Sequence, residues 1–170
     1  MNSTSEEKMA VIETLYKYAQ GLDTRDWQLY RSIFTDQIFV DFSSYHGQPG
    51  ERISADEWVA RLQPLFSGLA VTQHSMTNPL VTFDAQGAEC RMYMQAEHIH
   101  DPADRDSWYT IGGYYTDRLV REGGAWRIAS VKLTIFWRRG DPQCMVRAAQ
   151  QGMGTASEGK WQAWSRPVDG

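Results

Sequence analysis

The spacing of hydrophobic residues in this sequence changes once, close to Gly68. Before that residue, apolar side chains recur three and four positions apart, which is typical of amphipathic helices. After it, the spacing shortens to two over several long segments, which is typical of strands with two different faces. Helices followed by a run of antiparallel strands predict an α+β fold, with the helices packed on one face of a bent sheet.

The first part of the chain predicts three helices and one strand. The first helix begins near Ser5, with acidic residues in its first turn. A short second helix opens at residues 23–26, and a strand follows at residues 38–42. Residues 43–53, rich in Gly, Ser and Pro, are interpreted as a loop before a capping box at residues 54–57 that starts the third helix.

The second part predicts four strands, with a hairpin at Glu122-Gly123-Gly124 between the last two. They cover residues 69–84 (interrupted near Asn78-Pro79), 88–100, 108–121 and 126–139. We therefore expect one domain over residues 1–140. Residues 141–170 are expected to belong to it or to cap the pocket or a neighbouring subunit, with Trp161 and Trp164 as docking side chains.

The composition excludes several classes of partner. The net charge is -4, and no basic run exceeds Arg138-Arg139, so the clustered cations that nucleic acid binding requires are missing. No apolar stretch is long enough to span a bilayer, and residues 1–7 lack the features of a signal peptide. Cys90 and Cys144 form no CxxC pair or disulfide framework. We expect a cytoplasmic protein that contacts neither nucleic acid nor membrane.

One predicted strand ends its apolar face with a histidine. Side chains alternate along a strand, so one side of residues 88–100 carries Cys90, Met92, Met94, Ala96 and His98. A histidine in that position points into the interior and needs a partner. His98 is therefore either a core histidine bonded to a carbonyl or part of a site, and the sequence leaves both readings open.

His74 and Asp23 present the same choice. His74 lies on a partly apolar side of its strand, and Asp23 follows the first helix at a point where a carboxylate can cap the next one. A carboxylate that orients an imidazole gives a general base that works near neutral pH. The two residues would carry acid–base chemistry if the fold brought them together.

The remaining motifs favour chemistry without a metal or a cofactor. His98 and His100 stand at strand spacing, and His46 and His74 complete the histidines, but no HxxxH or CxxC spacing is present. No Gly-rich phosphate loop opens a helix, and no GxSxG elbow occurs.

An ordered set of motifs resembles SnoaL-like proteins of the nuclear transport factor two superfamily. The opening segment comprises residues 18–27, 33–36 and 40–42. The histidine strand comprises residues 72–78, and the closing hairpin comprises residues 112–117 and 124–128. The resemblance implies a cone-shaped α+β barrel, in which a strongly bent mixed sheet and the N-terminal helices enclose a pocket.

Within this family, the chain is most similar to the branch of scytalone dehydratase, bile-acid 7α-dehydratase and lindane dehydrochlorinase. Those enzymes are cofactor-free lyases that remove water or HCl with an Asp–His pair, and the resemblance puts Asp23 and His74 on that pair. It also puts Tyr18 and Arg138 near a pocket tyrosine and a pocket arginine of the bile-acid enzyme. His98 falls near the second histidine of scytalone dehydratase, whose second tyrosine has no clear match here.

The resemblance implies a dehydratase-like carbon–oxygen lyase acting on a hydroxylated, largely apolar ring compound. His74 would remove a proton from carbon, Asp23 would orient His74, and Tyr18 and His98 would bind the carbonyl or the leaving hydroxyl. One alternative is an isomerase or hydrolase that uses Asp23 as base, with a pKa raised by burial. Another is a non-catalytic small-molecule binding protein whose pocket is filled by aromatic side chains.

The last predicted strand is apolar on both sides. Trp126, Ile128 and Phe136 are expected on one side, opposite Ala129, Val131, Leu133, Ile135 and Trp137. A sheet with one face in water should alternate apolar with polar residues, so something covers the second face. The C-terminal tail or a second subunit fits this role. The resemblance favours association, and we predict a homo-oligomer, with a trimer ahead of a dimer.

Overall fold

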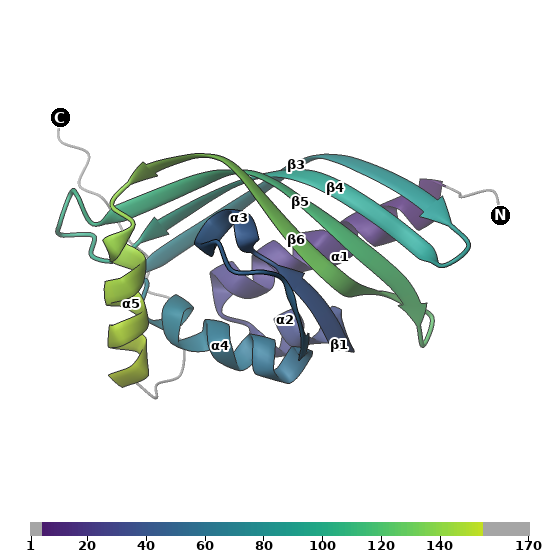
Figure 1. Ribbon diagram of the computed structural model, residues 1–170, viewed down its shortest axis with the longest axis horizontal. Helices are drawn as coiled ribbons and strands as arrows, with labels where there is room; N and C mark the ends of the chain where they lie inside the picture. Colours follow the sequence, from purple (N-terminus) through teal and green to yellow (C-terminus); the bar gives the residue numbers. More distant parts are fainter. Residues whose placement is uncertain (1–4, 155–170) are drawn as a thin grey trace.

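The computed structural model describes residues 5–154, in which a bent six-stranded sheet curves over the helices (Figure 1). The elements in chain order are α1 (Ser5–Thr24), α2 (Trp27–Ser32), β1 (Phe34–Asp41), α3 (Ser43–His46), β2 (Glu51–Ser54), α4 (Ala55–Ser67), β3 (Val71–Asp84), β4 (Gly87–Ile99), β5 (Trp108–Glu122), β6 (Ala125–Gly140) and α5 (Gln143–Gly154).

The strand order is β2-β1-β6-β5-β4-β3. Neighbouring strands are antiparallel except β1 and β6, which run parallel, so the sheet is mixed. The predicted α+β class and the bent mixed sheet are therefore confirmed. The sheet does not close into a full barrel, because β2 and β3 remain as its two edges among the described residues.

The turn between α1 and α2 depends on a glycine. A Cβ atom on Gly21 would lie 2.9 Å from the Cβ atom of Tyr30, closer than real side chains approach. Helix α1 continues through this glycine, and its missing side chain lets α2 pack directly on the end of α1. This close packing fixes the direction in which the chain leaves α1 after Thr24, so Asp23, expected to follow the first helix, lies in its last turn.

The residues that cap the next helices are Asp26 and Ser54. A side-chain oxygen of Asp26 accepts a hydrogen bond from the backbone N–H of Leu29 at 2.9 Å, which caps α2. The hydroxyl of Ser54 accepts one from the backbone N–H of Glu57 at 3.1 Å, as the predicted capping box requires. Since Asp26 caps α2, the carboxylate of Asp23 is available for another partner.

The predicted strands agree closely with β3 to β6. The interruption near Asn78 is a register shift between Thr77 and Leu80, where Asn78 adopts a φ of 54°. The hairpin between β5 and β6 turns through two glycines with positive φ, Gly123 and Gly124, as its sequence indicates.

The segment at residues 43–53 is more ordered than the predicted loop. It contains the one-turn helix α3 and the edge strand β2, which pairs with β1 through Ile53 and Ile38. The hydroxyl of Ser44 donates to the carbonyl of Leu133 at 2.8 Å and accepts from the backbone N–H of Ile135 at 3.1 Å. These two bonds fix α3 on β6.

The predicted facing of β6 is wrong for Trp126 and Ile128, which pack with the core, and for Trp137, which is exposed. A register shift between Gly112 and Gly113 leaves Phe136 as an extra residue and separates the side of Trp137 from that of Ile135. A register shift between Arg118 and Leu119 of β5 leaves Ala129 as an extra residue of β6, and such a bulge reverses the alternation of faces. Ile128 therefore shares the buried side with Val131 and Leu133 instead of lying opposite them.

The C-terminal part described here forms helix α5, which packs on α4 (Figure 1). Any side chain at Gly68 would collide with the backbone of Ala148, and one at Gly152 would collide with that of Pro64, so the two helices touch through their backbones. Trp161 and Trp164, expected to dock, lie outside the described residues. None of the described helices has the length and hydropathy to cross a membrane.

Candidate active site

A cavity of about 210 Å³ lies between the inner face of the sheet and the helices. An engineered protein cavity of about 150 Å³ holds benzene, so this cavity has room for at least one ring. Its wall is almost wholly apolar, and aromatic side chains dominate it. The lining residues are Tyr18, Leu22, Phe42, Tyr45, His46, Trp58, Leu62, Leu65, Phe66, His74, His98, Ile111, Tyr115, Leu133 and Met145.

Asp23 and His74, predicted as a pair, are in direct contact. The His74 Nδ1 atom lies 2.7 Å from Asp23 Oδ1, and the His74 backbone N–H donates to Asp23 Oδ2 at 2.7 Å. Because a carboxylate only accepts, Nδ1 carries a hydrogen and Nε2 keeps its lone pair in the neutral ring. No described residue hydrogen-bonds Nε2, and His74 lines the cavity. The ring is therefore arranged to take a proton from a ligand.

The pKa of the Asp23 carboxyl lies below its usual value. Burial alone raises this pKa, but the hydrogen bonds and charge of His74, with a smaller contribution from Thr72, outweigh burial. The carboxylate is therefore ionised at neutral pH, where it stabilises positive charge on the His74 ring. Both carboxylate oxygens are already bound to His74, so Asp23 is poorly placed to act as a base itself.

Arg25 fixes the segment that carries Asp23. Its backbone adopts a φ of 59°, and its guanidinium lies 5.6 Å from the ring centroid of Phe66. Burial lowers its pKa to about 10, so it stays charged at neutral pH. The guanidinium donates hydrogen bonds of 2.6–3.1 Å to five acceptors. These are the backbone carbonyls of Leu22, Asp23, Phe66 and Leu69 and the hydroxyl of Thr72.

His98 is a neutral acceptor beside His74. Its Nδ1 donates to the carbonyl of Tyr109 at 3.0 Å, so its Nε2 keeps a lone pair. Burial, and then the nearby charge of His74, lower its pKa to about 3. The His98 ring lies 5.8 Å from the His74 ring, nearly perpendicular to it, and it lines the cavity. His98 is thus both bonded to a carbonyl and available to a ligand.

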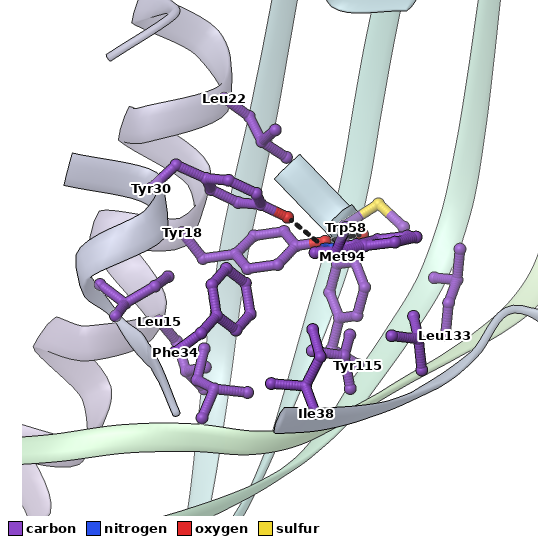
Figure 2. Close-up of a cluster of buried hydrophobic side chains, with 14 of the residues drawn as sticks. Leu15, Tyr18, Leu22, Tyr30, Phe34, Ile38, Trp58, Met94, Tyr115 and Leu133 are labelled. Carbon is purple, nitrogen blue, oxygen red and sulfur yellow. Dashed lines mark hydrogen bonds between the residues drawn. The ribbon is translucent and has the colours of Figure 1, made fainter. Parts of the chain in front are cut away.

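The hydroxyls of two tyrosines, Tyr18 and Tyr115, meet at the cavity wall (Figure 2). The Tyr18 hydroxyl donates to the Tyr115 hydroxyl at 3.5 Å, and behind them Trp58 Nε1 donates to the Tyr30 hydroxyl at 3.1 Å. Burial raises the pKa of Tyr18 and of Tyr115 well above its usual value, so both stay protonated. Tyr115 was not predicted, although the alternation that points Ile111 inward also points Tyr115 inward.

Arg138, predicted to bind substrate, is exposed and does not line the cavity. Its guanidinium donates to the carbonyls of Ser44 and Tyr45, at 2.7 and 3.0 Å, and lies 5.3 Å from the Tyr45 ring centroid. Arg138 therefore fixes α3, whose residues Tyr45 and His46 do line the cavity. Tyr45 and His46 were not predicted to line the cavity, because their segment was interpreted as a loop.

The four histidines do not gather into one cluster. His74 and His98 are neighbours, His46 lines another part of the cavity, and His100 binds Ser107 and Gln151 outside it. Across residues 5–154, no group of three or more His, Cys, Asp or Glu side chains is arranged to hold a metal ion.

Comparison with known proteins identifies relatives of this fold. The SnoaL-like domain family matches residues 3–132. The Kfla4162 protein of Kribbella flavida is 28% identical, with a TM-score of 0.76 over 85% of this chain and 99% of that one.

Two further solved structures share the fold at lower identity. A protein of Novosphingobium aromaticivorans, named as a candidate scytalone dehydratase, is 20% identical, with a TM-score of 0.69 over 79% of this chain and 87% of that one. A type 2 hexachlorocyclohexane dehydrochlorinase, LinA, is 16% identical, with a TM-score of 0.64 over 79% of this chain and 88% of that one.

Proposed function

Because the chain belongs to the SnoaL-like domain family of the nuclear transport factor two superfamily, we propose that its cavity is the active site of a dehydratase-like lyase. The substrate is a hydroxylated, largely apolar ring compound, and the protein's own side chains act as acid and base. The observation that carries this proposal is the double contact of Asp23 with His74, which leaves His74 Nε2 facing the cavity.

The reaction is the loss of water from a β-hydroxy ketone. His74 Nε2 takes a proton from the carbon next to the carbonyl, and the electron pair forms a C=C bond as the C–O bond of the hydroxyl breaks. The imidazolium then gives its proton to the departing oxygen, which leaves as water and restores neutral His74. Asp23, ionised and 2.7 Å from Nδ1, stabilises the imidazolium between these two proton transfers.

The other polar groups of the cavity bind the two substrate oxygens. The Tyr115 hydroxyl donates to the carbonyl oxygen, where negative charge grows in the transition state, and Tyr18, which donates to Tyr115, strengthens that hydrogen bond. His98 cannot supply a proton in this role, because its pKa is about 3 and its Nδ1–H is bound to Tyr109. Its Nε2 accepts the hydrogen of the substrate hydroxyl and so turns that oxygen's lone pairs toward His74.

Two observations favour this chemistry over the alternatives. An isomerase or hydrolase that uses Asp23 as base needs a raised pKa and a free oxygen, but the pKa of Asp23 is lowered and both oxygens bind His74. A binding protein with a filled pocket is disfavoured by the cavity of about 210 Å³.

The test is dehydration of two ring compounds, 3-hydroxycyclohexanone and 3-hydroxy-1-tetralone, by the purified protein. Their products, a conjugated enone and 1-naphthol, are followed by absorbance and fluorescence. We expect turnover by the wild-type protein and a loss of about 10²–10⁴-fold in His74→Gln, because a positioned base supplies a factor of that size. Equal turnover by the two proteins, or no wild-type dehydration of either compound, would sink the proposal.

A further inference from the structure

Besides Tyr18 and Tyr115, the polar side chains that line the cavity lie at two sides of it. His74 and His98 come from β3 and β4, whereas Tyr45 and His46 come from α3, which lies on β6 (Figure 1). Three interstrand spacings separate β3 from β6, which amounts to about 14 Å measured along the bent sheet. The wall between the two sides is largely apolar. A ligand that contacts both His74 and His46 therefore has to extend across these strands.

His46, which lines the cavity and is exposed, carries a hydrogen-bond donor at this side. Its Nδ1 accepts a hydrogen bond from the backbone N–H of Gln48 at 3.1 Å. The hydrogen of the neutral ring is therefore on Nε2, and no residue in the described range accepts it. The proposed dehydration does not use this group.

Tyr45 presents a second donor beside it. The Tyr45 and His46 rings lie 6.5 Å apart and nearly perpendicular. Burial raises the pKa of Tyr45 to about 12, so its hydroxyl keeps its hydrogen at neutral pH. Within residues 5–154, this hydroxyl has no hydrogen-bond partner.

The short helix that carries both donors is held firmly in place. Ser44 makes two hydrogen bonds to β6, and the Arg138 guanidinium binds two carbonyls of α3 while covering the Tyr45 ring. Donors held in advance lose little conformational entropy when a ligand arrives, so each hydrogen bond contributes more to affinity.

We propose that Tyr45 and His46 form a second binding end of the cavity, the α3 end, which binds an acceptor oxygen of the substrate far from the carbon that His74 deprotonates. The substrate is then an elongated compound of about two fused rings, with a hydroxyl at His98 and a carboxylate or carbonyl oxygen at the α3 end. The substrate's orientation in this inference rests on the proposed function; the binding of the acceptor oxygen does not.

The test is a calorimetric comparison of two probes, 2-naphthol and 6-hydroxy-2-naphthoate, which differ in the distant carboxylate. We expect the wild-type protein to bind the naphthoate about tenfold more tightly than 2-naphthol, because a hydrogen bond to a charged acceptor raises affinity by about this factor. His46→Phe should lose this preference and keep the affinity for 2-naphthol. The matched variant His46→Gln, whose amide N–H₂ can replace the ring donor, should retain most of the preference, and Tyr45→Phe should lose part of it.

Three outcomes overturn the inference: equal wild-type affinity for the two probes, no wild-type binding of either, or an equal loss for both probes in His46→Phe. His74→Gln separates this inference from the proposed reaction. This variant should lower dehydration about 10²–10⁴-fold and leave the naphthoate preference unchanged. If the wild-type protein prefers 6-hydroxy-2-naphthoate to 2-naphthol but has no dehydratase activity, the binding role of the α3 end is supported and the proposed lyase activity is refuted.

Discussion

Asp23 binds two different atoms of His74, the ring Nδ1 and the backbone nitrogen, each at 2.7 Å and across 51 positions of sequence. The contact joins the end of α1 to β3 and sets both the tautomer and the orientation of the ring. A substitution at Asp23 therefore changes the chemical state of His74 as well as its position.

The substitution Asp23→Asn should inactivate the protein with little change in its fold. The amide would donate to Nδ1, force the ring hydrogen onto Nε2 and so remove the lone pair that acts as base. We expect dehydration of 3-hydroxy-1-tetralone to fall about 10²–10⁴-fold, the range for a lost or mis-set general base. Steady-state kinetics measure the effect, and an unchanged near-ultraviolet circular dichroism spectrum is the control. Turnover close to wild type would contradict it.

The same pair predicts a change of stability in acid. The pKa of Asp23 is lower in the folded protein than the ordinary 3.8, so its contribution is present above pH 3.8 and is lost as the pH falls through the folded value. The free energies of unfolding of wild type and Asp23→Asn are measured with urea at several pH values between 6 and 3. We expect the difference between the two proteins to become smaller as the pH falls. A constant difference would contradict the assigned shift.

Asp117 predicts the opposite dependence. Its side chain is 1% exposed, its Oδ1 has no hydrogen-bond partner among the described residues, and burial raises its pKa far above the ordinary value, with a hydrogen bond from the Lys132 backbone opposing this in part. Because the pKa of Asp117 is higher in the folded protein than in the unfolded chain, its contribution to stability is fully present below pH 3.8. This contribution declines as the pH rises toward the folded pKa.

The variant Asp117→Asn, which cannot ionise, should therefore gain stability relative to wild type as the pH rises from 4 to 7, by at most about 1.4 kcal/mol per pH unit. Melting temperatures from circular dichroism measure this gain. A difference that stays flat over this range would mean that Asp117 ionises in the folded protein much as it does in the unfolded chain.

Arg25 should matter to stability beyond its charge. The variant Arg25→Lys keeps a cation but cannot reproduce the planar set of hydrogen bonds to α1, α4 and β3. We expect the unfolding free energy to fall by about 1–3 kcal/mol, the range for lost hydrogen bonds to a charged group. Chemical denaturation measures it, with Arg139→Lys as the matched exposed control. Equal midpoints for the two variants would refute this role.

The homo-oligomer, with a trimer ahead of a dimer, stays a prediction. The outer side of the sheet carries Leu80, Tyr93 and Phe136, which are 64%, 51% and 62% exposed, and the Phe136 ring lies 5.2 Å from that of Tyr114. We expect light scattering to give a multiple of 19.5 kDa, and Phe136→Glu to shift the protein toward the mass of one chain. A wild-type mass of 19.5 kDa would contradict association.

Local sequence patterns predicted the elements whose patterns extend over a whole helical turn or strand. The capping box at Ser54 and the alternation along β4 predicted α4 and the inward direction of His98, because each signal spans a whole turn or strand. Helix α3 is a single turn, too short for any periodicity, so Tyr45 and His46 were missed. The bulge at Ala129 is set by the register against β5, which has no local signal in β6.

The pairing of Asp23 with His74 could not be predicted from local sequence patterns. Either residue alone has an equally good local explanation, and no spacing rule connects positions 51 apart. The pair was expected only through the family resemblance. In the structure it depends on Asp26, which takes the capping role, and on Arg25, which holds the turn.

The parallel pairing of β1 with β6 also decides when this site can form during synthesis. Thr35 binds the carbonyl of Ile128, 93 positions later, so β1 can pair with β2 early but cannot pair with β6 until Ile128 has left the ribosome. Such distant pairing makes folding slow, because a long loop must close before its contacts contribute. Until then the aromatic residues that line the cavity lack the cover of β6, and exposed apolar side chains of this kind promote association between chains.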